Sequence, residues 1–239
     1  MTALKPRQLE LPHAENPRWP AMFPWLKAAL FCLPILILAD IASAASDTCK
    51  SGLTGRIQAD YRAMKSFKGR FDQVDRSSDG QPVKAKGEIY YLKPGKMRWV
   101  YAPPNDQVLV TDGKTVWLHD PILDNVTVQA LGNLTRGTPL AFLLGAGNLN
   151  SDFICRAQTK KPPADGLEYV ELVPRKAIPA LKFIQLGAKP GSARIAAIRM
   201  IDTQGNVRSI RFTGLVVNVA LDPSLFTFKI TPEMEVIVK

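Results

Sequence analysis

Short apolar runs follow one another from Ser66 almost to the C-terminus, and each is bounded by Gly, Pro, Asn or Asp. This pattern constrains the fold more than any other feature, because runs of this length and punctuation are typical of β-strands joined by tight turns. Turns such as Asp112-Gly113 leave little chain between neighbours, so we expect consecutive strands to pair as an antiparallel meander. The expected strands are Phe67–Val74, Lys86–Lys93, Lys96–Tyr101, Gln107–Thr111, Thr115–His119, Asn125–Ala130, Leu167–Pro174, Leu181–Gly187, Ile195–Asp202, Asn206–Val219 and Phe226–Lys229.

Several of these strands are apolar on both faces. Val108-Leu109-Val110 and Val116-Trp117-Leu118 have no polar side to turn toward water. Such strands need cover on two sides. One side is expected to form the core, and the other is either packed by helices or left as a hydrophobic chamber.

Two segments show helical signals. Apolar residues recur at helical spacing from Leu53 through Ile57 and Tyr61 to Met64, which indicates an amphipathic helix that rests on the β-structure. In Thr138–Gly145, a Thr-Pro start and a Gly end are typical of a short helix. Its apolar content exceeds one face, so it is interpreted as a core plug or as a lid over an apolar space.

The N-terminal region has the layout of a secretory signal peptide. Residues 28–39 carry no charge, Lys27 precedes them, and small residues follow at 41–45. An uncleaved membrane anchor is the alternative, but so short an apolar run does not span a bilayer. We therefore expect residues 1–44 to be an N-terminal extension plus signal peptide, with translation starting at Met22, cleavage after Ala44, and a single domain over residues 45–239.

The net charge of +10 points to anionic partners. Residues 1–44 hold four basic and three acidic side chains, so the exported part would still carry +9. Export and the lack of an aromatic-basic cluster argue against nucleic acid. Cys49 and Cys155 would then lie in a compartment that permits disulfides, and they either pair or remain two separate thiols.

The side chains needed for catalysis are scarce. Of the two histidines, His13 precedes the signal and His119 stands at a predicted strand end. The sequence has no metal-binding Cys or His motif, no nucleophile elbow and no Gly-rich phosphate loop. Carboxylates such as Asp75 are scattered through turns and solvated faces. We therefore expect a protein that is not an enzyme and uses neither a metal nor a cofactor.

Several motifs in order carry a family resemblance. They are Lys93-Pro94-Gly95-Lys96-Met97-Arg98-Trp99, Val108 to Trp117 with its Asp-Gly-Lys-Thr turn, Thr138-Pro139-Leu140 through Leu144, and Asp222 with Phe226-Thr227-Phe228. With these motifs the chain resembles the LolA family of periplasmic lipoprotein carriers, from about Leu53 to Val236.

The resemblance implies an incomplete antiparallel β-barrel, capped by helices, that encloses a hydrophobic cavity. It implies a periplasmic chaperone, expected here as a monomer, that carries the acyl chains of lipoproteins from the inner to the outer membrane. Its expected partners are acylated lipoproteins, an inner-membrane ABC lipoprotein-releasing transporter and an outer-membrane lipoprotein receptor. A carrier or sensor of another envelope lipid or glycolipid with the same fold is the alternative.

The resemblance also suggests roles for particular residues, with plain core packing as the alternative for each. The expected cavity and lid residues are Trp99, Leu109, Leu53, Ile57, Phe142, Leu143 and Leu144. Lys93 stands where the family often has an Arg that latches the lid, and a lysine lacks the planar fork of that guanidinium. Met97 stands at a position that faces the transporter in the family.

Overall fold

A computed structural model of the chain describes residues 52–77, 80–132, 148–156 and 159–239. The chain divides into two units, Met1–Ala39 and Asp40–Lys239, and every described residue belongs to the second. The predicted signal peptide and its cleavage site therefore lie outside the described residues. Among the residues that are described, none forms a helix with the length and apolar character needed to cross a membrane.

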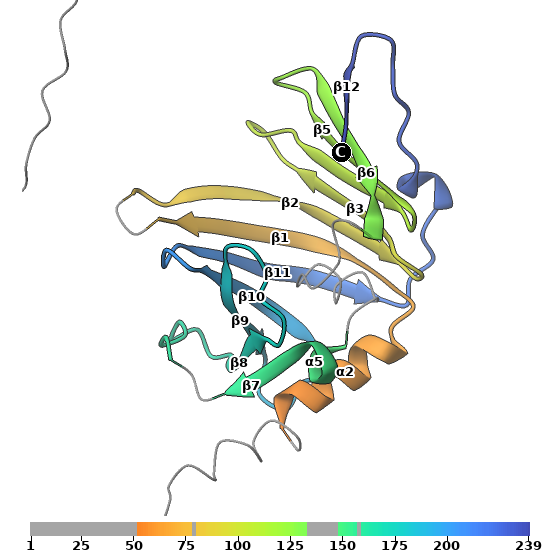
Figure 1. Cartoon of the computed structure of the whole chain (residues 1–239). Coiled ribbons are helices and arrows are strands. Elements are labelled where there is room, and N and C mark those ends of the chain that lie inside the picture. The colour runs from red at the N-terminus through yellow and green to blue at the C-terminus, as the bar shows by residue number, and fades with distance from the viewer. Residues whose placement is uncertain (1–51, 78–79, 133–147, 157–158) are drawn as a thin grey trace, which may run out of the picture. The chain divides into compact units, whose positions relative to one another are not determined.

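One sheet of 12 strands organises the second unit (Figure 1). The helices described beside it are α2 (Leu53–Ala63), α5 (Leu149–Asp152) and the 3-10 helix η2 (Pro223–Phe226). The strands are β1 (Ser66–Arg76), β2 (Val83–Leu92), β3 (Lys96–Tyr101), β4 (Val108–Asp112), β5 (Thr115–Asp120), β6 (Asn125–Ala130), β7 (Phe153–Arg156), β8 (Glu168–Pro174), β9 (Leu181–Ala188), β10 (Ile195–Asp202), β11 (Val207–Val217) and β12 (Glu235–Val238).

The sheet consists of two antiparallel meanders, and the pairing of β1 with β11 joins them in the middle of the sheet. Strands β1 to β6 pair in sequence order, as do β7 to β11, and β1 pairs with β11 so that Phe71 lies opposite Phe212. Strand β12 adds to β6 in parallel. Strands β7 and β12 are the two edges of this order, so the sheet is not closed. The predicted incomplete barrel, rich in strands and poor in helices, is confirmed.

The register assigns the main core to one face of the sheet. Directly opposite residues of an antiparallel pair point to the same face. Trp99 lies opposite Ile89 on β2 and opposite Leu109 on β4, while Phe71 lies opposite Phe212 on β11. These residues belong to or pack against a single hydrophobic cluster. We call the face that bears them the inner face.

Helix α2 rests on this cluster through its apolar stripe. Leu53, Ile57 and Tyr61 are buried members of the cluster, and Met64 joins them at the helix C-cap. The predicted amphipathic helix is therefore confirmed, with its end within one residue of the predicted end.

The outer face is covered differently in the two halves of the sheet. Helix η2 packs over β3 and β4 and buries Phe226. On β7 to β10 a row of directly paired polar residues crosses the strands, Arg156 to Glu171 to Gln185 to Arg199. Glu171 accepts hydrogen bonds from Arg156 Nε at 2.8 Å and Gln185 Nε2 at 3.0 Å, and Arg199 donates to Gln185. The outer face also bears a small apolar cluster of Phe183, Ile201 and Val207, but the larger apolar cluster lies on the inner face.

Sequence reasoning located ten strands to within a few residues and was wrong about Phe226–Lys229. Asp222 accepts a hydrogen bond from Ser224 N at 2.9 Å and caps η2, so Phe226 ends a 3-10 helix rather than starting a strand. The short elements α5, β7 and β12 were not predicted, because four residues are too few to show a hydrophobic period.

Gly87 leaves room for the Phe71 ring on the inner face. It stands opposite Phe71 on β1 and Tyr101 on β3. A Cβ built on Gly87 would lie 1.9 Å from the Val100 carbonyl oxygen and 2.8 Å from the Phe71 ring. The Val100 carbonyl belongs to the backbone of β3, which cannot move aside as a flexible side chain can. A larger residue at position 87 would therefore displace a strand.

We predict that Gly87→Ala lowers the free energy of unfolding by about 1–3 kcal/mol, the usual range for overpacking. Urea unfolding followed by circular dichroism measures this change. The matched control is Gly132→Ala, because a Cβ there would meet nothing within 4 Å. Equal stability of the two variants would contradict the close approach of β2 and β3.

Candidate functional site

Four aromatic side chains from strands β1, β3 and β11 meet on the inner face. The Phe71 ring lies 4.6 Å from the Trp99 ring and 5.1 Å from the Tyr101 ring, centroid to centroid. Phe212 approaches Trp99 edge-on at 6.2 Å. Offset and edge-on pairs of this kind stabilise an arrangement beyond the area they bury. They fix the middle of the inner face as a rigid apolar wall.

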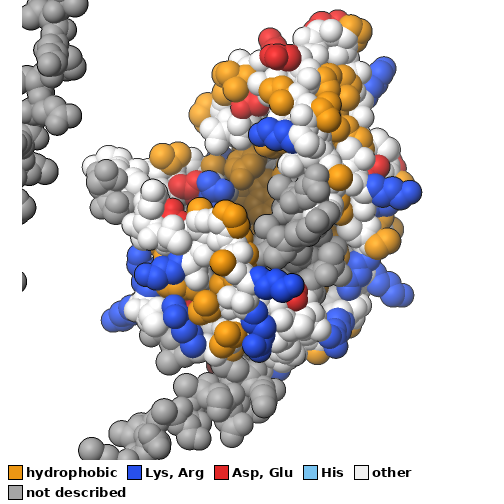
Figure 2. All heavy atoms as spheres, in the orientation of Figure 1, with side chains coloured by type: hydrophobic (Ala, Val, Ile, Leu, Met, Phe, Trp, Pro, Cys, Tyr) orange, Lys and Arg blue, Asp and Glu red, His pale blue; other side chains and the backbone are white. Residues whose placement is uncertain are grey.

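The molecule is hollowed over this wall. Figure 2 shows a depression in the middle of the displayed face, with hydrophobic side chains on its floor. Part of the apolar surface remains open to solvent, since Leu118, opposite Leu109 on the inner face, is 38% exposed. An open sheet with an apolar concave side can receive an apolar ligand without first breaking strand pairs.

The structure brings together the four predicted cavity residues that it describes. Trp99 is buried in the inner-face cluster and Leu109 packs against it partly exposed, while Leu53 and Ile57 reach it from α2. Ile57 is only 1% exposed, so a ligand would touch it only if α2 moved. The predicted lid residues Phe142, Leu143 and Leu144 lie outside the described residues.

Little space remains directly under the end of α2. An apolar cavity of about 30 Å³ lies between Tyr61 and Met64 on one side and Phe67, Phe212 and Leu215 on the other. A cavity of this size has room for about two water molecules. A ligand larger than water needs room elsewhere along the inner face or a displacement of α2.

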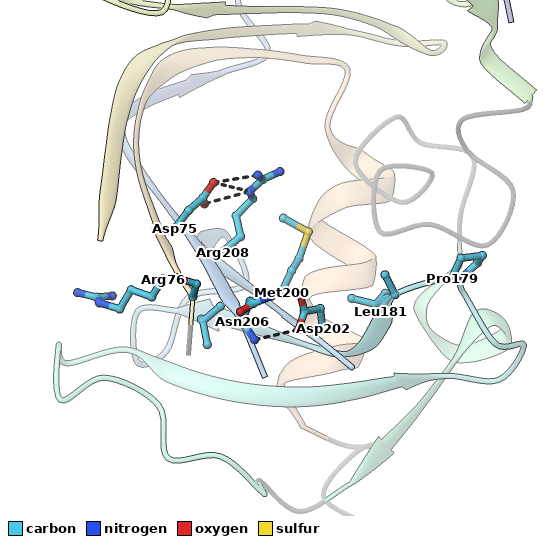
Figure 3. Close-up of a pocket in the computed structure, with 11 residues that line it drawn as sticks. Asp75, Arg76, Pro179, Leu181, Met200, Asp202, Asn206 and Arg208 are labelled. Carbon is cyan, nitrogen blue, oxygen red and sulfur yellow. Dashed lines mark hydrogen bonds and ion pairs between the residues drawn. The ribbon is translucent and has the colours of Figure 1, made fainter. Parts of the chain in front are cut away.

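A much larger pocket lies where β1, β10 and β11 meet the turn before β9. Its volume is about 550 Å³, within the range of small-molecule sites. Asp75 and Arg208 stand on one side, and Leu181, Met200 and Asp202 on another (Figure 3). We call it the rim pocket. A second pocket, of about 300 Å³, lies between β1, β2 and the Pro103-Pro104 turn.

Sequence reasoning missed the rim pocket. In the sequence Asp75 is one of several scattered carboxylates, and only the structure shows that Arg208 stands opposite it on β11. An acid and a base 133 positions apart give no local pattern, and only the β1 to β11 pairing could have revealed them.

Lys93 is held by the end of α2. Its Nζ donates to the carbonyl oxygens of Tyr61 at 2.6 Å and Arg62 at 3.0 Å and lies 5.5 Å from the centroid of the Tyr61 ring. Burial lowers the pKa of this ammonium from its usual value. A cation on the last carbonyls of a helix is favourable. The predicted lid latch involves residues outside the described part and stays a prediction.

Two further predicted residues lie in the core or close to it. Met97 is fully buried on the inner face, so direct contact with a partner protein would require this face to open. Cys155 is disulfide-bonded and half-buried, and its Sγ lies 3.9 Å from the Thr54 hydroxyl. Cys49 lies outside the described residues, so its pairing with Cys155 stays a prediction.

The described residues show little that resembles catalytic or metal chemistry. His119 packs against Phe228, with ring centroids 5.5 Å apart, at the end of β5. No three His, Cys, Asp or Glu side chains of the described ranges lie together in a way that could hold a metal ion. What the described part offers is an apolar wall with a charged pocket at its edge.

Comparisons with known proteins agree with this arrangement. Residues 62–229 match the model of the family "Outer membrane lipoprotein carrier protein LolA". The chain is 31% identical over 181 residues to an outer-membrane lipoprotein carrier protein of Cupriavidus taiwanensis, covering 74% of this chain and 83% of that protein. Proteins of the same name from Cupriavidus necator and Methylococcus capsulatus are 32% and 30% identical, over 81% and 83% of this chain and 88% and 91% of theirs.

We predict that Lys93→Met destabilises the protein by about 1–2 kcal/mol, because two carbonyls at the end of α2 lose a charged donor. Lys93→Arg should lose less, since a guanidinium also donates to carbonyl oxygens. Urea unfolding measures both, with exposed Lys114→Met as the control for loss of one positive charge. A Lys93→Met variant as stable as the Lys114→Met variant would show that the ammonium does not hold the helix.

Proposed function

Because the chain belongs to the LolA family of outer membrane lipoprotein carrier proteins, we propose that it carries lipoproteins across the periplasm with their acyl chains against the inner face. We assign the acyl chains to the inner face because it is the continuous apolar side of an open sheet and is hollowed and partly exposed. Monomeric proteins rarely leave a large apolar surface open unless it binds something.

Acyl chains suit this face energetically. Each methylene moved from water to an apolar wall gains about 0.8 kcal/mol, so a long chain supplies more free energy than a carrier needs. A carrier must also release its cargo. If helices and a lid close over the empty face, their packing competes with the acyl chain, and net affinity becomes a modest difference between two larger quantities.

The remaining steps of transport belong to the same proposal. Members of this family are periplasmic carriers, and for this chain we place export in a cleavable signal within residues 1–44. Cargo would come from an inner-membrane ABC transporter and pass to an outer-membrane receptor. The protein would act as a monomer and without catalysis. Phe142, Leu143 and Leu144 would form the lid, and Met97 would meet the transporter once the inner face opens.

We predict that Leu118→Glu lowers uptake of a purified acylated lipoprotein at least about tenfold, since a buried carboxylate among acyl chains is strongly unfavourable. Leu118 suits the test because it is 38% exposed and its replacement should leave folding intact. Uptake is measured by release of the lipoprotein from detergent-free membranes into the soluble fraction.

The matched control is Ile154→Glu, at a 47% exposed residue of edge strand β7. Ile154 lies opposite Val173 and points to the outer face, so its replacement should leave uptake unchanged. Equal uptake by the Leu118→Glu and wild-type proteins would refute binding on the inner face. Mass spectrometry of co-purified cargo would separate a lipoprotein carrier from a carrier of another lipid.

A further inference from the structure

We propose that the rim pocket receives the uncharged head of the acylated cargo, the glyceryl thioether of its lipid-modified N-terminal cysteine, and disfavours lipids that carry a phosphate. This inference rests on the proposed function, because it assumes that acyl chains lie on the inner face. It adds a subsite and a chemical reason for choosing one lipid over another.

The pocket continues the apolar wall. Leu181 and Met200 line the pocket, and both also pack against the inner-face cluster. Figure 3 shows Asp75 and Arg208 turned toward each other above Met200, so the charged groups stand at the edge of the apolar surface. An amphiphile whose chains lie along the cluster would place its polar head at this boundary.

Arg208, Asp75 and Asp202 already have hydrogen-bond partners, and the Arg76 side chain extends away from them (Figure 3). Arg208 donates to Asp75 from Nε at 3.0 and 3.1 Å and from a terminal nitrogen at 2.8 Å. Asp75 also accepts from Gln73 Nε2 at 3.1 Å. Asp202 is held by its own turn, with hydrogen bonds from Gln204 N and from the backbone and side chain of Asn206.

The formal charges of the pocket cancel. Its charged lining residues are two arginines, Arg76 and Arg208, and two aspartates, Asp75 and Asp202. A phosphate would have to displace Asp75 from Arg208 and would then lie beside an unpaired carboxylate. Like charges in such proximity are costly. A phospholipid is therefore a poor fit for this site.

An uncharged head meets no such penalty. Ester, thioether and amide groups accept hydrogen bonds without bringing a net charge, and the guanidinium fork has donors directed at fixed angles. The guanidinium of Arg208 has N–H groups beyond those that bind Asp75. One of them can donate to an ester carbonyl while the bonds to Asp75 remain. The pocket thus suits an uncharged diacylglyceryl head, such as that of the lipid-modified cysteine, and it disfavours a phosphate-bearing head through the repulsion of Asp75.

The test compares two probes with the same acyl chains, an N-acetylated dipalmitoyl-S-glyceryl-cysteine peptide, whose head is uncharged, and dipalmitoyl phosphatidylglycerol. Each displaces a fluorescent fatty acid from the full mature protein. The wild type should prefer the lipopeptide. Asp75→Asn frees Arg208 and should strengthen phosphatidylglycerol binding about fivefold or more, with that gain reduced by added salt. Arg208→Gln should weaken lipopeptide binding at least about threefold, through the lost donors.

The matched control is Glu168→Gln, which frees Arg56 from a pair of similar exposure, at 3.2 Å, away from the pocket. If Asp75→Asn and Glu168→Gln give the same lipid preference as the wild type, the rim pocket does not bind the polar head of the lipid and the inference fails. If the wild type binds neither probe, or Leu118→Glu binds the lipopeptide as well as the wild type does, the proposed function itself fails. Urea unfolding checks that each variant is folded.

Discussion

The antiparallel pairing of β1 with β11 is the contact on which the rest of the structure depends. It joins two meanders that could otherwise form separate sheets, and it aligns Phe71 with Phe212 in the middle of the inner face. These strands are far apart in sequence, so the pairing must overcome a large loop-closure entropy. The aromatic contacts and the buried face that it completes supply the compensating free energy.

The same pairing explains why the sheet stays open yet folded. The core extends along the inner face from β7 to β5. Helix α2 closes one part of it and is held by Lys93 at its last carbonyls. The outer face is stabilised separately. Helix η2 covers one half of it, and the paired polar residues of β7 to β10 bind one another on the other half. Among the described residues, the contacts that stabilise the sheet therefore do not require the remaining part of the inner face to be filled.

The local sequence pattern predicted most of the strands and helix α2, because the spacing of apolar residues and the turn residues can be recognised within a few neighbouring positions. It could not predict which strands become neighbours across long separations, so the seam between β1 and β11 and the parallel addition of β12 to β6 were missed. The predicted cavity residues came from the family resemblance, and they meet because paired Trp99 and Leu109 and the apolar stripe of α2 contact the same cluster. The rim pocket was invisible, since Asp75 and Arg208 become partners only when the seam forms.

An apolar wall by itself is a poor discriminator. Hydrophobic burial is non-directional and grows with area, so palmitoyl chains on a phospholipid and on a lipoprotein would gain nearly the same free energy. A carrier in a compartment bounded by phospholipid membranes needs another source of selectivity. Paired charges at the edge of the wall provide it, because their neutrality penalises an anionic head far more than an uncharged one. On the proposed function, affinity comes from the inner face and the choice of cargo from its rim.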